Sequence, residues 1–260
     1  LLDRVSDRIA ETTGARELVE LGAGTARKTR HLIGAFLKRQ GTFHYAPLDI
    51  SEYALARASE SLSMEFPGLY ITGVQCDYTE TLDPLDPDPG CLAAYLGSTI
   101  GNFPHGRGVA LLRRLHDRLA EGDWLLMGVD LVKSVDVLEA AYNDSAGVTA
   151  EFNKNILNVV NREMVGNFDP DDFCHLAFFN SEESQIEMHL VAERDMTVRL
   201  EGPGLELGIA QGERIRTEIS RKFTRDSASS LLAEAGFELE HWFESEDGYF
   251  GLALASVRYA

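Results

Sequence analysis

The stretch LVELGAGT, residues 18–25, decides the fold class, because a short apolar run ends in two glycines one residue apart and a helical pattern follows. The same order of strand, turn and helix then repeats along the chain. Further strands are predicted over residues 43–48, 69–74, 91–96 and 124–129. Helical crossovers between such strands are typical of a doubly wound α/β sheet that is mostly parallel and carries helices on both faces.

Two antiparallel strands close the predicted sheet. Residues 237–244 and 249–257 are strand-like, and an Asp247-Gly248 turn joins them. Together with the five strands before them they make a seven-stranded sheet.

The alternation of strands and helices breaks over residues 134–221. Helical stretches at 135–142 and 149–164 are followed there by strand-like segments. We therefore expect a small α+β insertion that forms a substrate-binding subdomain. Residues 1–133 and 222–260 are expected to form the cofactor-binding core.

The composition favours a small-molecule partner. Lys and Arg number 24 against 42 Asp and Glu, which gives a formal net charge of −18. An acidic surface repels phosphate backbones and anionic lipid, so neither nucleic acid nor a membrane is an expected partner. No apolar run approaches the roughly 20 residues of a membrane span, and the charged first residues do not form a signal peptide, so a cytoplasmic location is expected.

The cysteines and histidines show no metal-binding spacing. The three cysteines, Cys76, Cys91 and Cys174, are far apart and are interpreted as packing residues. The seven histidines form no HxxH, HxxxH or HExxH pattern. We expect no metal site.

Candidate ligand-binding residues follow the first three predicted strands, because ligands of an open parallel sheet bind outside the carboxyl ends of its strands. Gly22 and Gly24 let the backbone approach a ligand closely, although such a pair alone is equally compatible with a plain tight turn. Arg27 occupies the place of the third glycine of a dinucleotide fingerprint, which disfavours an NAD-dependent oxidoreductase.

Acidic residues strengthen this interpretation at the next two strand ends. Asp49 stands where a carboxylate can accept both ribose hydroxyls, and Asp77-Tyr78 offers an acceptor for an exocyclic amine and an aromatic face for a purine. The series predicts a nucleoside ligand without a diphosphate. S-adenosylmethionine is the commonest cofactor of that kind.

Longer motifs then resemble the histidine Nα-methyltransferase family of ergothioneine biosynthesis. The likeness runs from Glu17 to the last strand and rests on the segments LGSTIGNF (96–103), GVDLVK (128–133), AYND (141–144), VTAEFN (148–153), IEM (186–188) and TEIS (217–220). The resemblance implies a methyltransferase sheet and S-adenosylmethionine as cofactor, with S-adenosylhomocysteine as its product. It implies trimethylation of the α-amine of L-histidine to hercynine, by way of the mono- and dimethyl forms.

The resemblance also implies roles for individual residues. The positions that match the family's cofactor site are Gly22, Lys28, Asp49, Asp77, Tyr78 and Gly97. Asn102 matches the residue that holds the α-amine and carboxylate of the amino acid, and Tyr142 matches a carboxylate contact; these two are the catalytic candidates. Met188, Glu218 and Ser220 match the residues around the imidazole ring.

The amino acids alone leave other interpretations open. Gly101-Asn102 by itself favours a turn, and Glu218 with Ser220 by itself favours a solvated strand face. Members of the family have a further Tyr-rich N-terminal segment that helps to close the amino-acid pocket, and this chain begins after it. The alternatives are a related methyltransferase for another small amine or amino acid, and a truncated cofactor-binding domain without activity.

Overall fold

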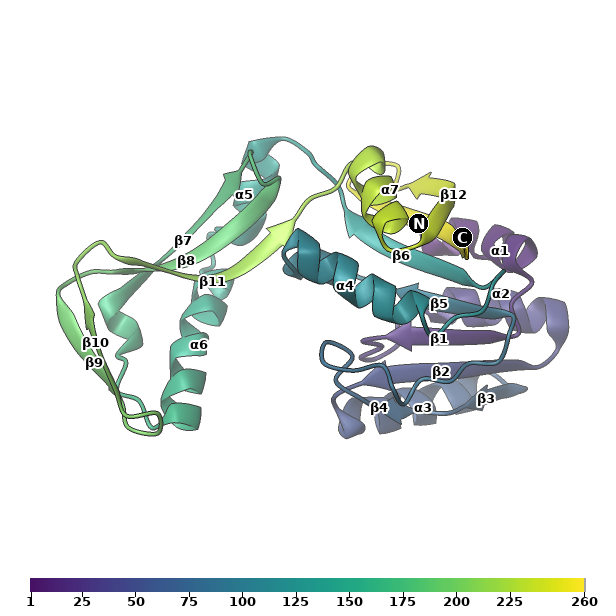
Figure 1. The fold of residues 1–260 in the computed structure, drawn as a ribbon, viewed down its shortest axis with the longest axis horizontal. Coiled ribbons are helices and arrows are strands. Elements are labelled where there is room, and N and C mark those ends of the chain that lie inside the picture. Colours follow the sequence, from purple (N-terminus) through teal and green to yellow (C-terminus); the bar gives the residue numbers. More distant parts are fainter. Residues whose placement is uncertain (260) are drawn as a thin grey trace. The chain divides into compact units, whose positions relative to one another are not determined.

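The computed structural model describes residues 1–259, which divide into two compact units (Figure 1). The core unit consists of Leu1–Leu131 together with the chain from Phe223 onward, and the inserted unit is Val132–Lys222. The boundaries predicted from the sequence lie after residues 133 and 221. No helix within residues 1–259 is both long and apolar enough to cross a membrane.

The core unit is built on one large sheet, in the order β12-β13-β6-β5-β1-β2-β3 with β4 also beside β2. Strands β1 to β6 pair in parallel, whereas β13 runs antiparallel to both β6 and β12. The mostly parallel α/β sheet with a closing antiparallel pair is confirmed. The strands are β1 (Glu17–Leu21), β2 (Phe43–Asp49), β3 (Leu69–Ile71), β4 (Val74–Gln75), β5 (Cys91–Tyr95), β6 (Trp124–Asp130), β12 (Phe237–Glu244) and β13 (Phe250–Val257).

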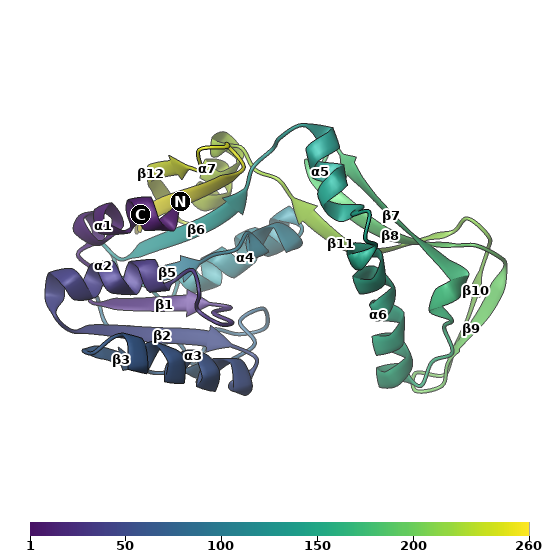
Figure 2. The same ribbon diagram turned by 180° about the vertical axis from the view of Figure 1, so that it is seen from behind.

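Helices cover both faces of this sheet (Figure 1, Figure 2). Neighbouring strand residues point to opposite faces, so Leu18 packs with Ile9 and Leu62, and Val19 packs with Leu112 and Leu231. The sheet is therefore doubly wound. The first face carries α1 (Leu2–Thr13), α2 (Arg30–Gln40) and α3 (Glu52–Glu65), and the second carries α4 (His105–His116) and α7 (Arg225–Glu234).

Two details of the core differ from the sequence prediction. The single third strand expected over 69–74 is interrupted after Ile71, so β3 and β4 pair separately with β2 and the seven expected strands become eight. The helix expected from Ala26 begins only at Arg30. Ala26 has a φ of +49°, a left-handed conformation that a right-handed helix does not accommodate.

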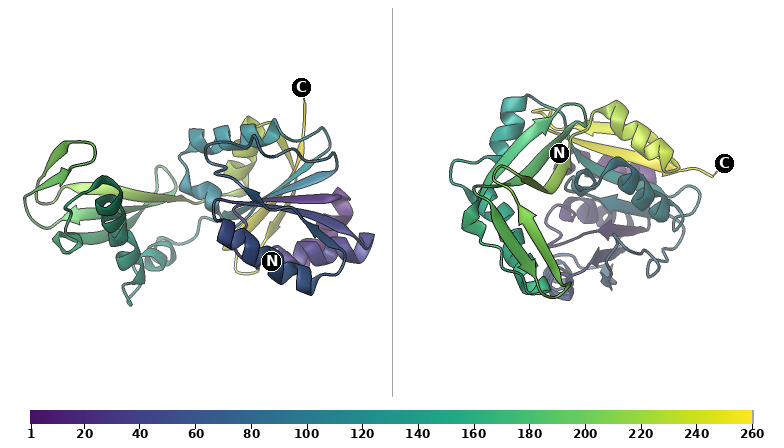
Figure 3. Two further views of the ribbon diagram at one scale, coloured as in Figure 1. Left: turned by 90° about the horizontal axis from the view of Figure 1, so that it is seen from below. Right: turned by 60° about the vertical axis from the view of Figure 1, so that its left-hand side comes forward.

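The inserted unit contains a three-stranded antiparallel sheet in the order β11-β8-β7 and a separate β9-β10 hairpin (Figure 3). Strand β7 was not predicted, because its burial does not alternate along the strand. Cys174 in this strand is exposed, so the prediction that it packs in the interior was wrong. The elements are α5 (Val135–Tyr142), α6 (Val148–Met164), β7 (Phe173–Asn180), β8 (Gln185–Ala192), β9 (Met196–Leu200), β10 (Leu205–Ile209) and β11 (Arg214–Arg221).

Candidate active site

The loop after β1 takes its shape from two glycines with positive φ angles, +68° at Gly22 and +52° at Gly24. A Cβ atom at Gly22 would lie 3.1 Å from Oη of Tyr78, and its backbone conformation would be strained for any other residue. Glycine at this position therefore lets the Tyr78 side chain pack directly on the loop. The Tyr78 ring in turn packs edge-on against Tyr95 of β5, with centroids 5.7 Å apart.

Asp49, the last residue of β2, joins this loop to the start of α3. Its Oδ2 accepts a hydrogen bond from the Gly24 N–H at 2.9 Å, and its Oδ1 accepts one from the Ser51 N–H at 2.9 Å. Ser51 caps α3 by accepting from the Ala54 N–H, as predicted. Each carboxylate oxygen keeps one lone-pair direction, so Asp49 can still accept the two hydroxyls of a ribose.

Lys28 and Gly97 are brought together at the end of β5. A Cβ atom at Gly97 would lie 3.3 Å from Nζ of Lys28. Gly97 and Ser98 both have positive φ angles, +80° and +63°, and Oγ of Ser98 accepts from the Asp130 N–H at 2.8 Å. Ser98, a non-glycine residue in a left-handed conformation, links the ends of β5 and β6 and was not predicted from the sequence.

A cavity of about 800 Å³ lies within the core unit at these strand ends. Its walls include Gly22, Lys28 and Gly97 of the predicted cofactor residues. A volume of this size suits a small-molecule ligand, whose usual pockets span about 300 to 1,000 Å³. Asp49 and Tyr78 contact the Gly22–Gly24 loop without lining the cavity.

The cavity wall also contains a buried carboxylate that the sequence analysis left without a role. Glu20 accepts from the Thr29 hydroxyl, 2.6 Å from Oε1 and 2.7 Å from Oε2, and from the Tyr45 hydroxyl. Burial raises the pKa of Glu20 to about 7, while the two hydroxyls and Lys28 act in the opposite direction. The feature of the sequence that could have identified Glu20 is its position between the apolar residues Val19 and Leu21 of a buried strand.

The remaining two predicted residues of the core unit stand away from the cavity walls. Asp77 is exposed, and its Oδ1 accepts from the Thr79 hydroxyl at 2.6 Å and the Thr79 N–H at 2.9 Å, which lowers the pKa of Asp77. Asn102 is exposed at the end of a short 3-10 helix, η1 (Thr99–Asn102). Neither residue lines the cavity.

In the inserted unit, three polar side chains form a closed triangle. The Tyr142 hydroxyl donates to Oγ of Ser220 at 2.9 Å, and Nζ of Lys222 donates to both, at 3.0 Å to Tyr142 and 2.9 Å to Ser220. Nζ of Lys222 also lies 4.9 Å from the centroid of the Tyr142 ring. Lys222 is only 3 % exposed and was not identified from the sequence.

Glu218 and Ser220 lie on one face of β11, as their spacing predicted. Glu218 is paired in register with Met188 of β8, and Ser220 with Ile186. Burial raises the pKa of Glu218, and the positive charge of Lys222 partly offsets the shift. Met188 is 2 % exposed and packs with Leu138 of α5.

A second set of hydrogen bonds holds the backbone carbonyl of Tyr142. Nε2 of His175 is 2.9 Å from the Tyr142 carbonyl, and Nδ2 of Asn153 is 2.9 Å from Nδ1 of His175. Since an amide nitrogen only donates, Nδ1 of His175 accepts and its Nε2–H donates to Tyr142. The Thr217 hydroxyl donates to Oδ1 of Asn153 at 2.5 Å, from a bulge in β11 that follows Arg216.

Comparisons with known proteins agree with these features. The model of the family "Histidine-specific methyltransferase, SAM-dependent" matches residues 1–257. Histidine N-alpha-methyltransferases of Mycolicibacterium smegmatis and Mycobacterium tuberculosis are 42 % and 39 % identical, each over 96 % of this chain and 78 % of its own length. Ergothioneine biosynthesis protein 1 of Schizosaccharomyces pombe is 28 % identical over 94 % of this chain and 33 % of its own length.

The fold has counterparts among solved structures. An S-adenosylmethionine-dependent methyltransferase from Clostridium acetobutylicum superposes with a TM-score of 0.55 at 10 % identity, covering 99 % of this chain and 91 % of that one. At that identity the likeness shows the fold alone. The family match, which spans nearly the whole chain, shows that the protein belongs to the histidine-specific, S-adenosylmethionine-dependent methyltransferases.

Proposed function

We propose that this chain transfers three methyl groups in succession from S-adenosylmethionine to the α-amine of L-histidine, forming hercynine for ergothioneine biosynthesis. The observation that carries the proposal is the pair Glu218 and Ser220 on one face of β11, in a chain 42 % identical to a histidine N-alpha-methyltransferase. A carboxylate and a hydroxyl match the two nitrogens of an imidazole ring, because one nitrogen donates and the other accepts.

The cofactor is proposed to bind in the core unit, where the residues present fit it. The cavity holds the cationic Lys28 for a carboxylate, and Asp49 retains two free acceptor directions for ribose hydroxyls. When bound, S-adenosylmethionine supplies an electrophilic methyl group on a sulfonium. The proposed cofactor residues are Gly22, Lys28, Asp49, Asp77, Tyr78 and Gly97.

The substrate roles are proposed residue by residue. Asn102 would accept an N–H of the α-amine and leave the nitrogen lone pair directed at the methyl donor, and Tyr142 would contact the substrate carboxylate. Alignment of nucleophile and methyl carbon is the main contribution such a protein makes to an in-line displacement. Met188, Glu218 and Ser220 would enclose the imidazole.

Two further expectations belong to this proposal. The net charge of −18 supports a small-molecule partner over nucleic acid or a membrane surface. A cytoplasmic location is the second expectation.

A time course of product masses tests the proposal. The purified chain is incubated with S-adenosylmethionine and L-histidine, and the histidine mass is followed for one, two and three added methyl groups. A trimethylated product is expected. Cofactor binding without any methylated histidine, or methylation of a different amine offered in parallel, would overturn the substrate assignment and favour the alternatives that the sequence left open.

A further inference from the structure

The turn after β5 begins with two consecutive residues in the left-handed conformation. Gly97 has a φ of +80° and Ser98 a φ of +63°. Glycine adopts such angles freely, whereas a residue with a side chain is strained there. Strain of this kind persists only where the surrounding contacts hold it, so the contacts of Ser98 indicate what the strain maintains.

A hydrogen bond from the neighbouring strand holds Ser98. Strand β6 continues past its last pairing with β5, which joins Met127 to Tyr95, and ends at Asp130. The Asp130 N–H donates to Oγ of Ser98 at 2.8 Å. The end of β6 therefore fixes the conformation in which the chain leaves β5.

The conformation of Ser98 in turn sets the path of η1. The Ser98 carbonyl accepts from the Gly101 N–H at 2.9 Å, and η1 ends at the next residue, Asn102. Ile100, in the middle of η1, is only 1 % exposed and anchors the turn in the core. Because Ser98 also lines the cavity, this short turn connects the cavity wall to the residue proposed to hold the α-amine.

We propose that Ser98 is a positioning residue for methyl transfer: the hydrogen bond that it accepts from Asp130 fixes η1, and η1 holds Asn102 where its amide oxygen aligns the α-amine with the methyl group of the cofactor. This inference rests on the proposed function and deepens it. In-line displacement is sensitive to alignment, and a displacement of about 1 Å can slow such a step about 100-fold. Ser98 makes its contribution through Asn102.

The variant Ser98→Gly separates alignment from stability. Glycine relieves the strain of the left-handed conformation and removes the hydrogen bond, and these two changes oppose each other in folding stability. The rate constant of the first methyl transfer to histidine, measured by product mass in single turnovers with both ligands saturating, should fall about tenfold. The urea midpoint and the affinity for S-adenosylmethionine should change little. A rate reduced by less than about threefold would overturn the inference.

A double-mutant cycle with Asn102→Ala tests whether Ser98 acts through Asn102. Asn102→Ala should slow the same step at least as much as Ser98→Gly does, because it removes the amide that the turn positions. The double variant should then be no slower than Asn102→Ala alone, since a turn without its amide has nothing left to align. Two losses that multiply in the double variant would show that Ser98 acts independently of Asn102, and would overturn the inference.

Ser63→Gly is the control, at an exposed position of α3. A glycine within a helix lowers the urea midpoint but leaves the turn after β5 intact, so the rate of methyl transfer should match that of the wild type. A fall equal to that of Ser98→Gly would show a general effect of lost stability and overturn the positioning role. Failure of the wild type to methylate histidine would instead overturn the proposed function.

Discussion

The two units build their polar sites in different ways. In the core unit the site is shaped by the backbone, through left-handed residues such as Gly22, Gly24 and Gly97 and through carboxylates that accept from N–H groups. In the inserted unit it is a network of side chains from separate elements, such as Tyr142 of α5 and Ser220 of β11. Backbone geometry leaves a short local motif in the sequence, whereas a side-chain network depends on register between distant segments.

The largest effect is expected from a substitution at the proposed cofactor site of the core unit. Asp49→Ala removes the acceptor for the Gly24 and Ser51 N–H groups together with two proposed hydrogen bonds to the cofactor. Hydrogen bonds to a charged group contribute about 1.5 to 3 kcal/mol each, so affinity for S-adenosylmethionine should fall at least about 100-fold. Titration calorimetry measures this loss.

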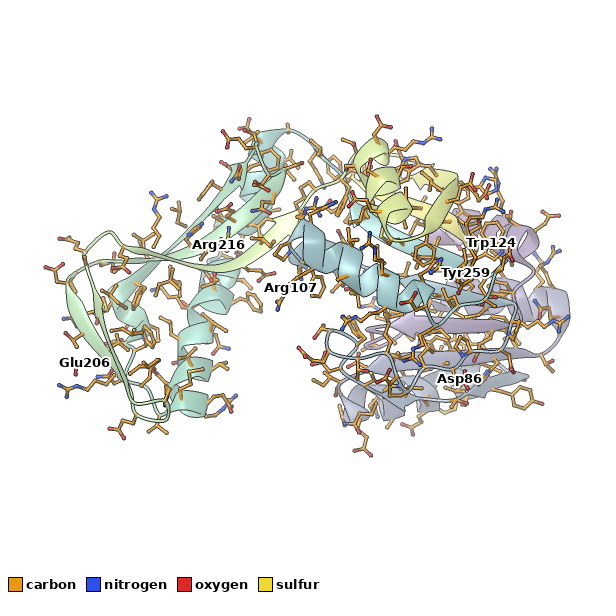
Figure 4. All side chains as sticks on the ribbon, viewed as in Figure 1. Asp86, Arg107, Trp124, Glu206, Arg216 and Tyr259 are labelled. Carbon is orange, nitrogen blue, oxygen red and sulfur yellow. The ribbon has the colours of Figure 1, made fainter. Side chains whose placement is uncertain are left out.

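Asp86→Ala is the matched control, because Asp86 is an exposed acid of the same unit (Figure 4). It should bind the cofactor as the wild type does. An Asp49→Ala protein with undiminished affinity would remove the ribose assignment.

A second prediction concerns the buried Glu20 of the core unit. Its pKa is about 7 in the folded protein against 4.5 for an ordinary glutamate, so the carboxyl stabilises the fold fully below pH 4.5 and this contribution is lost as the pH rises to about 7. A shift of this size corresponds to about 3 kcal/mol. Urea unfolding between pH 4.5 and 8 should show the free energy of unfolding of the wild type falling relative to Glu20→Gln; parallel curves would contradict the assignment.

The third prediction concerns Glu218 of the inserted unit. Glu218→Ala removes the carboxylate proposed to accept the imidazole N–H, and kcat/KM for histidine should decrease more than tenfold. Affinity for S-adenosylmethionine should be unchanged, because the proposed cofactor residues lie in the core unit. Glu182→Ala, an exposed acid of the inserted unit, is the control. Undiminished turnover of histidine by Glu218→Ala would reject the imidazole role.

The smallest effect is expected from the network behind Tyr142. Thr217→Val removes the hydroxyl that donates to Oδ1 of Asn153 and keeps the shape of the side chain. Losing one such hydrogen bond costs about 1 kcal/mol of unfolding free energy. Urea denaturation of wild type and variant measures it, and Ser181→Ala at an exposed turn supplies the reference. A Thr217→Val protein as stable as the wild type would show that Asn153 is held by its other contacts.

The same contrast explains how much the sequence could predict. Local rules were sufficient for the β1 turn, the Ser51 cap and the antiparallel pair after Gly236, because each depends on a few neighbouring residues. They failed at Ala26, where a left-handed residue delays α2, and at β7, whose burial does not alternate along the strand. Lys222 was missed because its two partners are brought to it only by the fold.

A competition among amino acids tests the central claim most directly. The chain is given S-adenosylmethionine and an equimolar mixture of the common amino acids, and every product mass is recorded. The account predicts that histidine alone gains methyl groups, and that it gains three. Methylation of another amino acid with histidine untouched would contradict it.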